Sequence, residues 1–111
     1  MNVKFDRVKD KLIAHMIGEL DHHSAEEVRY LIDDRLDREN INKLIIDFSD
    51  VTFMDSSGIG VVIGRYKKLG MKNGIVCVSN VRDSINRVFE LSGMYKIVKL
   101  YDTFENAVKY L

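Results

Sequence analysis

The chain opens with two short stretches in which apolar and polar residues alternate. Val3–Val8 and Leu12–Ile17 both follow the period of two that is typical of β-strands. Only Lys9 and Asp10 separate the two stretches, which is the spacing of a tight turn. We therefore predict an antiparallel hairpin at the start of the fold.

Beyond the hairpin, apolar residues recur every three or four positions in several segments, as they do along amphipathic helices. Capping residues and glycines set the ends that we expect for these helices. The expected helices run from Ser24 to about Arg38, from a cap within Asp55–Ser57 to Gly70, from Asn80 to Gly93, and from Asp102 to Leu111.

Two of these helices begin with the spacing of a capping box, in which two side chains each accept a backbone N–H of the other residue. Ser24 and Glu27 have this spacing in the first helix, and Asp102 and Glu105 have it in the last. Asp21, three residues before Ser24, is a competing start for the first helix. The pattern alone leaves both starts open.

Three short apolar runs lie between the helices and predict further strands. Leu44–Phe48 is almost continuously apolar, which is typical of an inner strand that is buried on both faces. Asp50–Asp55 is then expected to be a loop. Ile75–Val78 is a second short buried strand, and Ile97–Leu100 is expected at the edge of the sheet.

The order of elements indicates an α/β fold. Strands that alternate with helices pair in parallel through right-handed crossovers, and only the opening hairpin is antiparallel. We therefore predict one small, mixed but mostly parallel sheet with an N-terminal hairpin and about four helices. A chain of 111 residues fits one domain, which we expect to span residues 1–111.

The composition excludes several classes of protein. With 46% hydrophobic and 31% charged residues, the chain resembles an ordinary soluble globule. We expect no membrane segment and no signal peptide, because no apolar run approaches the length of about 20 residues that a membrane helix needs. The net charge is zero, so there is no electrostatic footprint for direct binding of nucleic acid.

The segment Phe53–Gly60, with the sequence FMDSSGIG, is the strongest candidate for a functional site. It lies where the chain passes from an inner strand into a helix, and α/β proteins place their sites at that end of the sheet. Asp55, Ser56 or Ser57 could each cap the helix by accepting a backbone N–H. A plain helix cap is therefore one interpretation of the segment.

Two enzymatic or ligand-binding interpretations fit the segment poorly. A serine-hydrolase elbow needs glycines on both sides of the serine and a later histidine, whereas all three histidines precede Ser56. Gly58, Gly60 and Gly64 come within one residue of a phosphate-binding pattern, but no lysine follows in the required place. We expect these glycines to allow close packing of the helix on the sheet. Nucleotide binding remains an alternative.

A third interpretation is that one of the serines receives a phosphate. A helix N-terminus has free N–H groups and a positive dipole end, so it can accommodate a dianion. The added charge, about −1.5 to −2, would then be felt by a partner that docks there.

Other residues that could carry chemistry have simpler interpretations. The pair His22 and His23 lies among carboxylates, but no third ligand follows at a suitable spacing, so we expect no metal site. His15 falls within a strand and is expected to be half-buried with its hydrogen bonds satisfied. Cys77 is the only cysteine, which excludes a disulfide, and it is expected to behave as a small buried apolar residue.

Two segments together carry a resemblance to a known family. Gly18–His23 (GELDHH) and Phe53–Gly60 (FMDSSGIG) resemble the bacterial anti-sigma factor antagonists of the STAS family. Gly64–Lys67 (GRYK) and Phe89–Gly93 (FELSG) extend the likeness, which covers essentially the whole chain. Within the family, the sequence is most like the sporulation group, the anti-sigma-F factor antagonists.

This resemblance implies a function that the residue pattern alone does not give. Members of the family are small cytoplasmic proteins that bind an anti-sigma factor, which is also a serine kinase, and thereby release its sigma factor. The kinase phosphorylates the first serine of the motif, here Ser56, and this turns binding off. A PP2C-type phosphatase reverses the change. The family fold has its helices mainly on one face of the sheet.

On this basis we expect a binding protein rather than an enzyme, with no cofactor. The expected partner surface comprises Asp21, Asp55, Ser56, Ser57 and Gly58. A monomer is the simplest expectation. A STAS scaffold that is not phosphorylated and a nucleotide-binding STAS module remain as alternatives.

Overall fold

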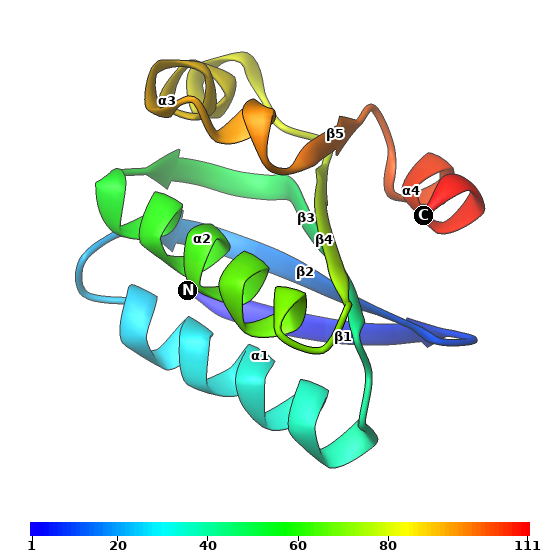
Figure 1. Ribbon diagram of the computed structural model, residues 1–111. Helices are drawn as coiled ribbons and strands as arrows, with labels where there is room; N and C mark the ends of the chain where they lie inside the picture. Colours follow the sequence, from blue (N-terminus) through cyan, green and yellow to red (C-terminus); the bar gives the residue numbers. More distant parts are fainter.

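Five strands form a single sheet whose spatial order is the order of the sequence. The computed structural model describes residues 1–111 (Figure 1). The strands are β1 (Asn2–Val8), β2 (Lys11–Leu20), β3 (Lys43–Met54), β4 (Ile75–Ser79) and β5 (Lys99–Tyr101). β1 and β2 are antiparallel, and the other neighbours are parallel. The expected α/β class and opening hairpin are confirmed.

The helices cover the two faces of the sheet unequally. They are α1 (Ala25–Glu39), α2 (Ser56–Gly70), α3 (Asp83–Ser92) and α4 (Phe104–Tyr110), with a short 3₁₀ helix, η1, at Met94–Lys96. α1, α2 and α3 contribute to the main core on one face, whereas α4 packs on the other face (Figure 1). The expectation that the helices lie mainly on one face is confirmed.

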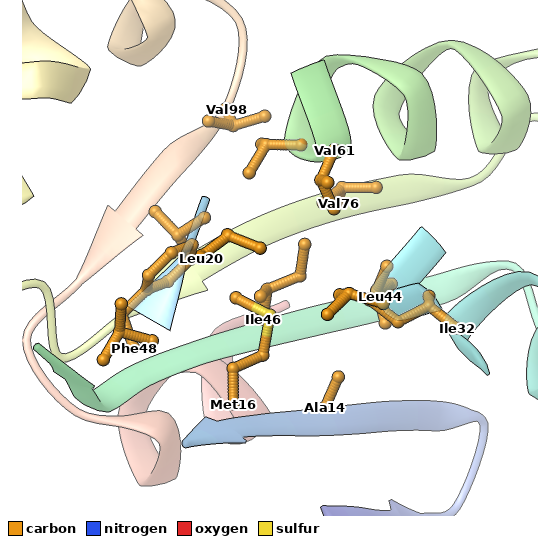
Figure 2. Packing of buried hydrophobic residues seen from close by; sticks show 14 of the residues in the cluster. Ala14, Met16, Leu20, Ile32, Leu44, Ile46, Phe48, Val61, Val76 and Val98 are labelled. Carbon is orange, nitrogen blue, oxygen red and sulfur yellow. The ribbon is translucent and has the colours of Figure 1, made fainter. Parts of the chain in front are cut away.

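The alternation of strand residues separates a large core from a small one. On the inner face of the sheet, Ala14 and Met16 of β2 and Ile46 and Phe48 of β3 join a cluster of 24 buried apolar residues (Figure 2). On the outer face, the small cluster consists of Ile13, Ile45, Cys77 and Ala107. Burial of the Cys77 thiol raises its pKa to about 12, so Cys77 is the buried apolar residue that was expected.

The predicted loop at Asp50–Asp55 is wrong, because β3 continues as far as Met54. β2 likewise runs beyond Ile17, and the two strands stay paired to Leu20 and Met54. Two register shifts interrupt this pairing, so apolar and polar residues do not alternate regularly in the extended ends of the two strands. The strands therefore extend past the end of β4 and bring their last residues together.

Two helix starts also differ from the expected ones. Asn80 does not begin α3: its φ of 56° is left-handed, and its side chain donates to Asp47 at 2.7 Å. The N-cap of α3 is Arg82. In α4, the cap is Thr103 rather than Asp102, and its hydroxyl accepts the N–H of Asn106 at 3.1 Å.

Of the two glycines predicted to cap the ends of helices, only one has that role. Gly93 adopts φ 74° after α3, which confirms it as a C-terminal cap. Gly70 is instead the last residue of α2, and the left-handed residue that follows is Asn73, with φ 57°. After Gly93, η1 occupies residues that precede the shorter edge strand β5. No helix of the structure is long and apolar enough to cross a bilayer.

Candidate functional site

The start of α2 is held by the carboxylate of Asp55. Asp55 is extended, and its Oδ1 accepts the backbone N–H of Ser57 at 2.8 Å. The first N–H groups of a helix have no partner within the helix, so an aspartate at the N-cap satisfies one of them. Of the three candidate caps, Asp55 is therefore the residue that performs this role.

The same residue ties α2 to the segment before α1. The second carboxylate oxygen of Asp55 accepts the backbone N–H of His22 at 3.3 Å. In return, the backbone N–H of Asp55 donates to the carbonyl of Leu20 at 3.3 Å. The segments that carry Asp21 and Ser56 thus lie together at one end of the sheet, where α1 and α2 both begin (Figure 1).

Asp21 organises the turn that leads into α1. Its Oδ1 accepts the backbone N–H groups of His23 at 2.9 Å and of Ser24 at 3.0 Å. The N–H of Ser24, followed by that of His23, holds the pKa of the Asp21 carboxyl below its usual value. Asp21 therefore caps the turn that precedes α1, while the regular helix begins at Ala25, directly after Ser24.

The predicted capping box between Ser24 and Glu27 is wrong. Ser24 has helical φ and ψ and makes no side-chain cap hydrogen bond. Its hydroxyl points back instead and donates to the carbonyl of Glu19 at 2.8 Å. An extended backbone is needed at an N-cap, and the turn held by Asp21 excludes that conformation for Ser24.

Ser56 and Ser57 differ in exposure. Ser56 is the first residue of α2, its side chain is exposed, and its hydroxyl makes no hydrogen bond within the chain. Ser57 is half-buried and lines a groove of about 270 Å³ between the starts of α1 and α2. None of the histidines donates to or accepts from either serine hydroxyl. Of the two, Ser56 is the more accessible to another protein.

Gly58 is a point of close contact between α2 and the ends of β2 and β3. A Cβ placed there would lie 2.3 Å from Cγ of Met54 and 3.0 Å from Cδ2 of Leu20. The prediction of close packing is therefore correct for Gly58. It is wrong for Gly60 and Gly64, where a Cβ would meet no atom within 4 Å.

Acidic side chains surround this end of the molecule. Two adjoining hollows contain them: the groove beside Ser57 includes Glu26, and a hollow of about 480 Å³ includes Glu19, Asp21 and Glu27. The basic side chain in the groove is Arg29, and the start of α2 has no acidic residue in its first turn. A negative group on Ser56 would be adjacent to the carboxylate of Asp55, and the neighbouring Ser57 shares its groove with Glu26 and Arg29.

The contacts that join the two segments could not be predicted from the sequence. The ties between Asp55 and the backbone of Leu20 and His22 involve main-chain atoms, and no side-chain pattern records them. The support of Gly58 by Met54 and Leu20 was missed for a similar reason, because it depends on the extended ends of β2 and β3. The spacing of Asp21 and Ser24 was the feature of the sequence that indicated the turn before α1.

Comparisons with known proteins agree with this architecture. The family model described as "STAS domain" matches residues 2–107. An anti-sigma F factor antagonist of Paenibacillus polymyxa is 34% identical over 108 residues, which is 97% of this chain and 92% of that protein. The structure of the anti-sigma factor antagonist SpoIIAA in its unphosphorylated form has a TM-score of 0.76 and 28% identity, and the match covers 97% of this chain and 96% of that one. The phosphorylated form, from Bacillus, also has a TM-score of 0.76, with 26% identity and coverage of 99% and 100%.

Proposed function

The chain belongs to the STAS domain family, and on that premise we propose that it is an anti-sigma factor antagonist that phosphorylation of Ser56 switches off. In the unphosphorylated form it binds an anti-sigma factor, which then releases its sigma factor. The observation that carries the proposal is that the hydroxyl of Ser56 is exposed and makes no hydrogen bond within the chain. The neighbouring Asp55 connects the start of α2 to the backbone of His22, next to Asp21. The solved forms of SpoIIAA, one unphosphorylated and one phosphorylated, support the choice of a phosphate as the signal.

The partner surface that we propose comprises Asp21, Asp55, Ser56, Ser57 and Gly58. Asp21 and Asp55 order the two backbone segments, and Gly58 seats the start of α2 against Leu20 and Met54. The side chain of Ser56 is then presented by an ordered backbone. A preorganised surface of this kind binds without a large ordering cost.

The switch is electrostatic in this account. Phosphorylation replaces a neutral hydroxyl by a group of about −1.5 to −2 charges at pH 7. That group would be attached next to Asp55, and the adjacent Ser57 lines the groove that contains Glu26. A partner that docks on Ser56 would have to desolvate the dianion, and like charges placed across an interface cost several kcal/mol. The free N–H groups of the helix accommodate the phosphate within the protein itself, so the fold is retained.

The proposed partners follow from the family. The anti-sigma factor acts as the serine kinase, and a PP2C-type phosphatase restores the hydroxyl. Neither reaction needs a catalytic group from this chain, for which Ser56 is a substrate site. A role in sporulation is our further expectation, because the Paenibacillus relative is named for anti-sigma F factor.

Incubation with the cognate kinase and ATP, followed by peptide mass spectrometry, tests the assignment of the site. We expect one phosphate per chain, located on Ser56, and no label on the Ser56→Ala variant. Ser57→Ala is the matched control, because it removes the neighbouring hydroxyl, and any label on that variant should still be located on Ser56. Label on Ser57 of the unaltered protein would refute the assignment.

A further inference from the structure

His15 lies between two carboxylates on the outer face of the sheet. Its Nδ1 is 2.7 Å from Oδ2 of Asp47 in β3, and its Nε2 is 3.1 Å from Oδ2 of Asp6 in β1. The His15 side chain is 19% exposed, and the edge of its ring meets Phe104 of α4. The half-buried, hydrogen-bonded histidine expected from the sequence is confirmed, and it links three neighbouring strands.

Asp47 is the fixed end of this link. Its side chain is only 3% exposed, and the amide of Asn80 and the hydroxyls of Ser49 and Ser79 all donate to it. Burial alone would raise the pKa of Asp47, but hydrogen bonds from Asn80, His15 and Ser49 outweigh burial and hold it below its usual value. Asp47 is therefore an ionised acceptor, and the ring nitrogen that faces it must carry a proton.

Asp6 is the free end of the link. Its side chain is 69% exposed, so water can solvate its oxygens as well as His15 does. A neutral imidazole donates from one nitrogen only, whereas an imidazolium donates from both. The bond to Asp47 uses the first proton, so the bond to Asp6 needs the second.

A further charged residue lies on the neighbouring strand. Lys4 of β1 is directly opposite His15 in the strand register. α4 contributes the Phe104 ring and makes no ion pair with His15. The ring thus contacts the carboxylates of Asp6 and Asp47, and the exposed side chain of Lys4 lies on the same face of the hairpin.

We propose that His15 is a proton-operated clamp on the edge strand β1. The doubly protonated ring ties Asp6 to Asp47 and so fastens β1 across β2 to β3. When the ring loses one proton, it keeps Asp47 and releases Asp6.

Because β1 begins next to the candidate site, release of the clamp would affect that site. β1 is at the edge of the sheet and pairs with β2 alone. Its start lies beside the candidate site, because Met1 Cα is 3.5 Å from the position of a Cβ at Gly18. Met1 also lines the same hollow as Asp21. Loosening of β1 would therefore reach the Asp21 turn.

Native-state hydrogen exchange of the unphosphorylated protein tests the clamp without any partner. We expect the opening of β1 amides, corrected for intrinsic exchange rates, to increase about fivefold between pH 5.5 and pH 8, the effect of one partly exposed charged hydrogen bond. Asp6→Ala should abolish this response. Asp6→Asn should keep β1 protected at pH 8, because its amide can donate to the unprotonated Nε2.

The remaining histidines provide the control. A His22→Gln, His23→Gln double variant leaves His15 as the only histidine, and it should show the full response of β1. Exchange of β1 that is independent of pH, a response that persists in Asp6→Ala, or a response that is lost in the double variant would each overturn the proposal.

The order of proton loss gives a second, direct readout. In a long-range ¹H–¹⁵N correlation spectrum, the Nε2 of His15 should lose its proton as the pH rises while the Nδ1 keeps its own. Loss of the Nδ1 proton first would contradict the clamp.

Discussion

The carboxylate of Asp55 accepts hydrogen bonds from both segments of the candidate site. Loss of an N-cap aspartate costs about 1 kcal/mol of stability. We expect Asp55→Ala to lower the free energy of unfolding by about that amount in urea denaturation. Ser56→Ala is the matched control, because the Ser56 hydroxyl makes no hydrogen bond. The free energy of unfolding of this variant should be nearly unchanged. Equal losses in the two variants would contradict the role of Asp55 as the cap.

Gly58 is the glycine of α2 that leaves no room for a side chain. A methyl group there would overlap the buried side chain of Met54, and overpacking of this kind typically costs about 1–3 kcal/mol. Because Met54 is flexible, we expect Gly58→Ala to lose about 1–2 kcal/mol of unfolding free energy. Gly60→Ala in the same helix meets open space and should instead gain up to about 1 kcal/mol. Changes of the same sign in the two variants would refute this difference in packing.

At the scale of elements, Asp47 joins β2, β3 and β4. Its pKa is lowered in the folded protein, so the stability that it contributes is fully present above its unfolded value, near 3.8. That contribution is lost as the pH falls through the lower folded value. We expect Asp47→Asn to be less stable than the unaltered protein at pH 7, and the difference to shrink as the pH approaches 3.

Urea denaturation at several pH values measures this difference. Asp50→Asn is the control in the same strand, because Asp50 is exposed and makes no side-chain hydrogen bond. A stability difference for Asp47→Asn that stays constant from pH 7 to pH 3 would contradict the account.

The sequence predicts elements well where one local rule decides them. The hairpin around Lys9 and the buried run Leu44–Phe48 follow directly from the period of the apolar residues. Asn80 was misassigned because its side chain satisfies Asp47, a residue 33 positions away, rather than the helix that follows. The ends of β2 and β3 were missed because register shifts break the alternation there. These errors arise from contacts between distant segments.

The arrangement of the candidate site was predictable in part. The motif pattern predicted Asp55, Ser56, Ser57 and Gly58 as site residues, and the spacing of Asp21 and Ser24 indicated the turn that Asp21 holds. The sequence could not reveal that Asp55 joins both segments, since it does so through the backbone of Leu20 and His22. Exposure of Ser56 against partial burial of Ser57 likewise depends on the packing of α1 against α2.

At the scale of the whole molecule, one phosphate changes the balance of charge. The 17 basic and 17 acidic residues cancel, so phosphorylation of Ser56 would move the net charge from zero to about −2. The group would be attached at an exposed position on the start of α2, away from both cores. We therefore expect the fold to be unaffected.

A ¹H–¹⁵N spectrum of the phosphorylated protein tests this expectation. Shift changes should be confined to the start of α2, the Asp21 turn and the groove between them. The Ser56→Ala variant provides the reference for loss of the hydroxyl without added charge. Changes throughout β4, β5 and α4 would show that the phosphate alters the fold.

The proposed switch depends on the affinity of a single surface in two chemical states. Titration calorimetry of the anti-sigma factor kinase with the unmodified protein and with the form fully phosphorylated on Ser56 measures it most directly. We expect phosphorylation to weaken binding at least tenfold, which corresponds to about 1.4 kcal/mol, with Ser56→Ala binding like the unmodified form and Ser56→Asp binding weakly. Equal affinity of the kinase for the unmodified and phosphorylated forms would contradict the account.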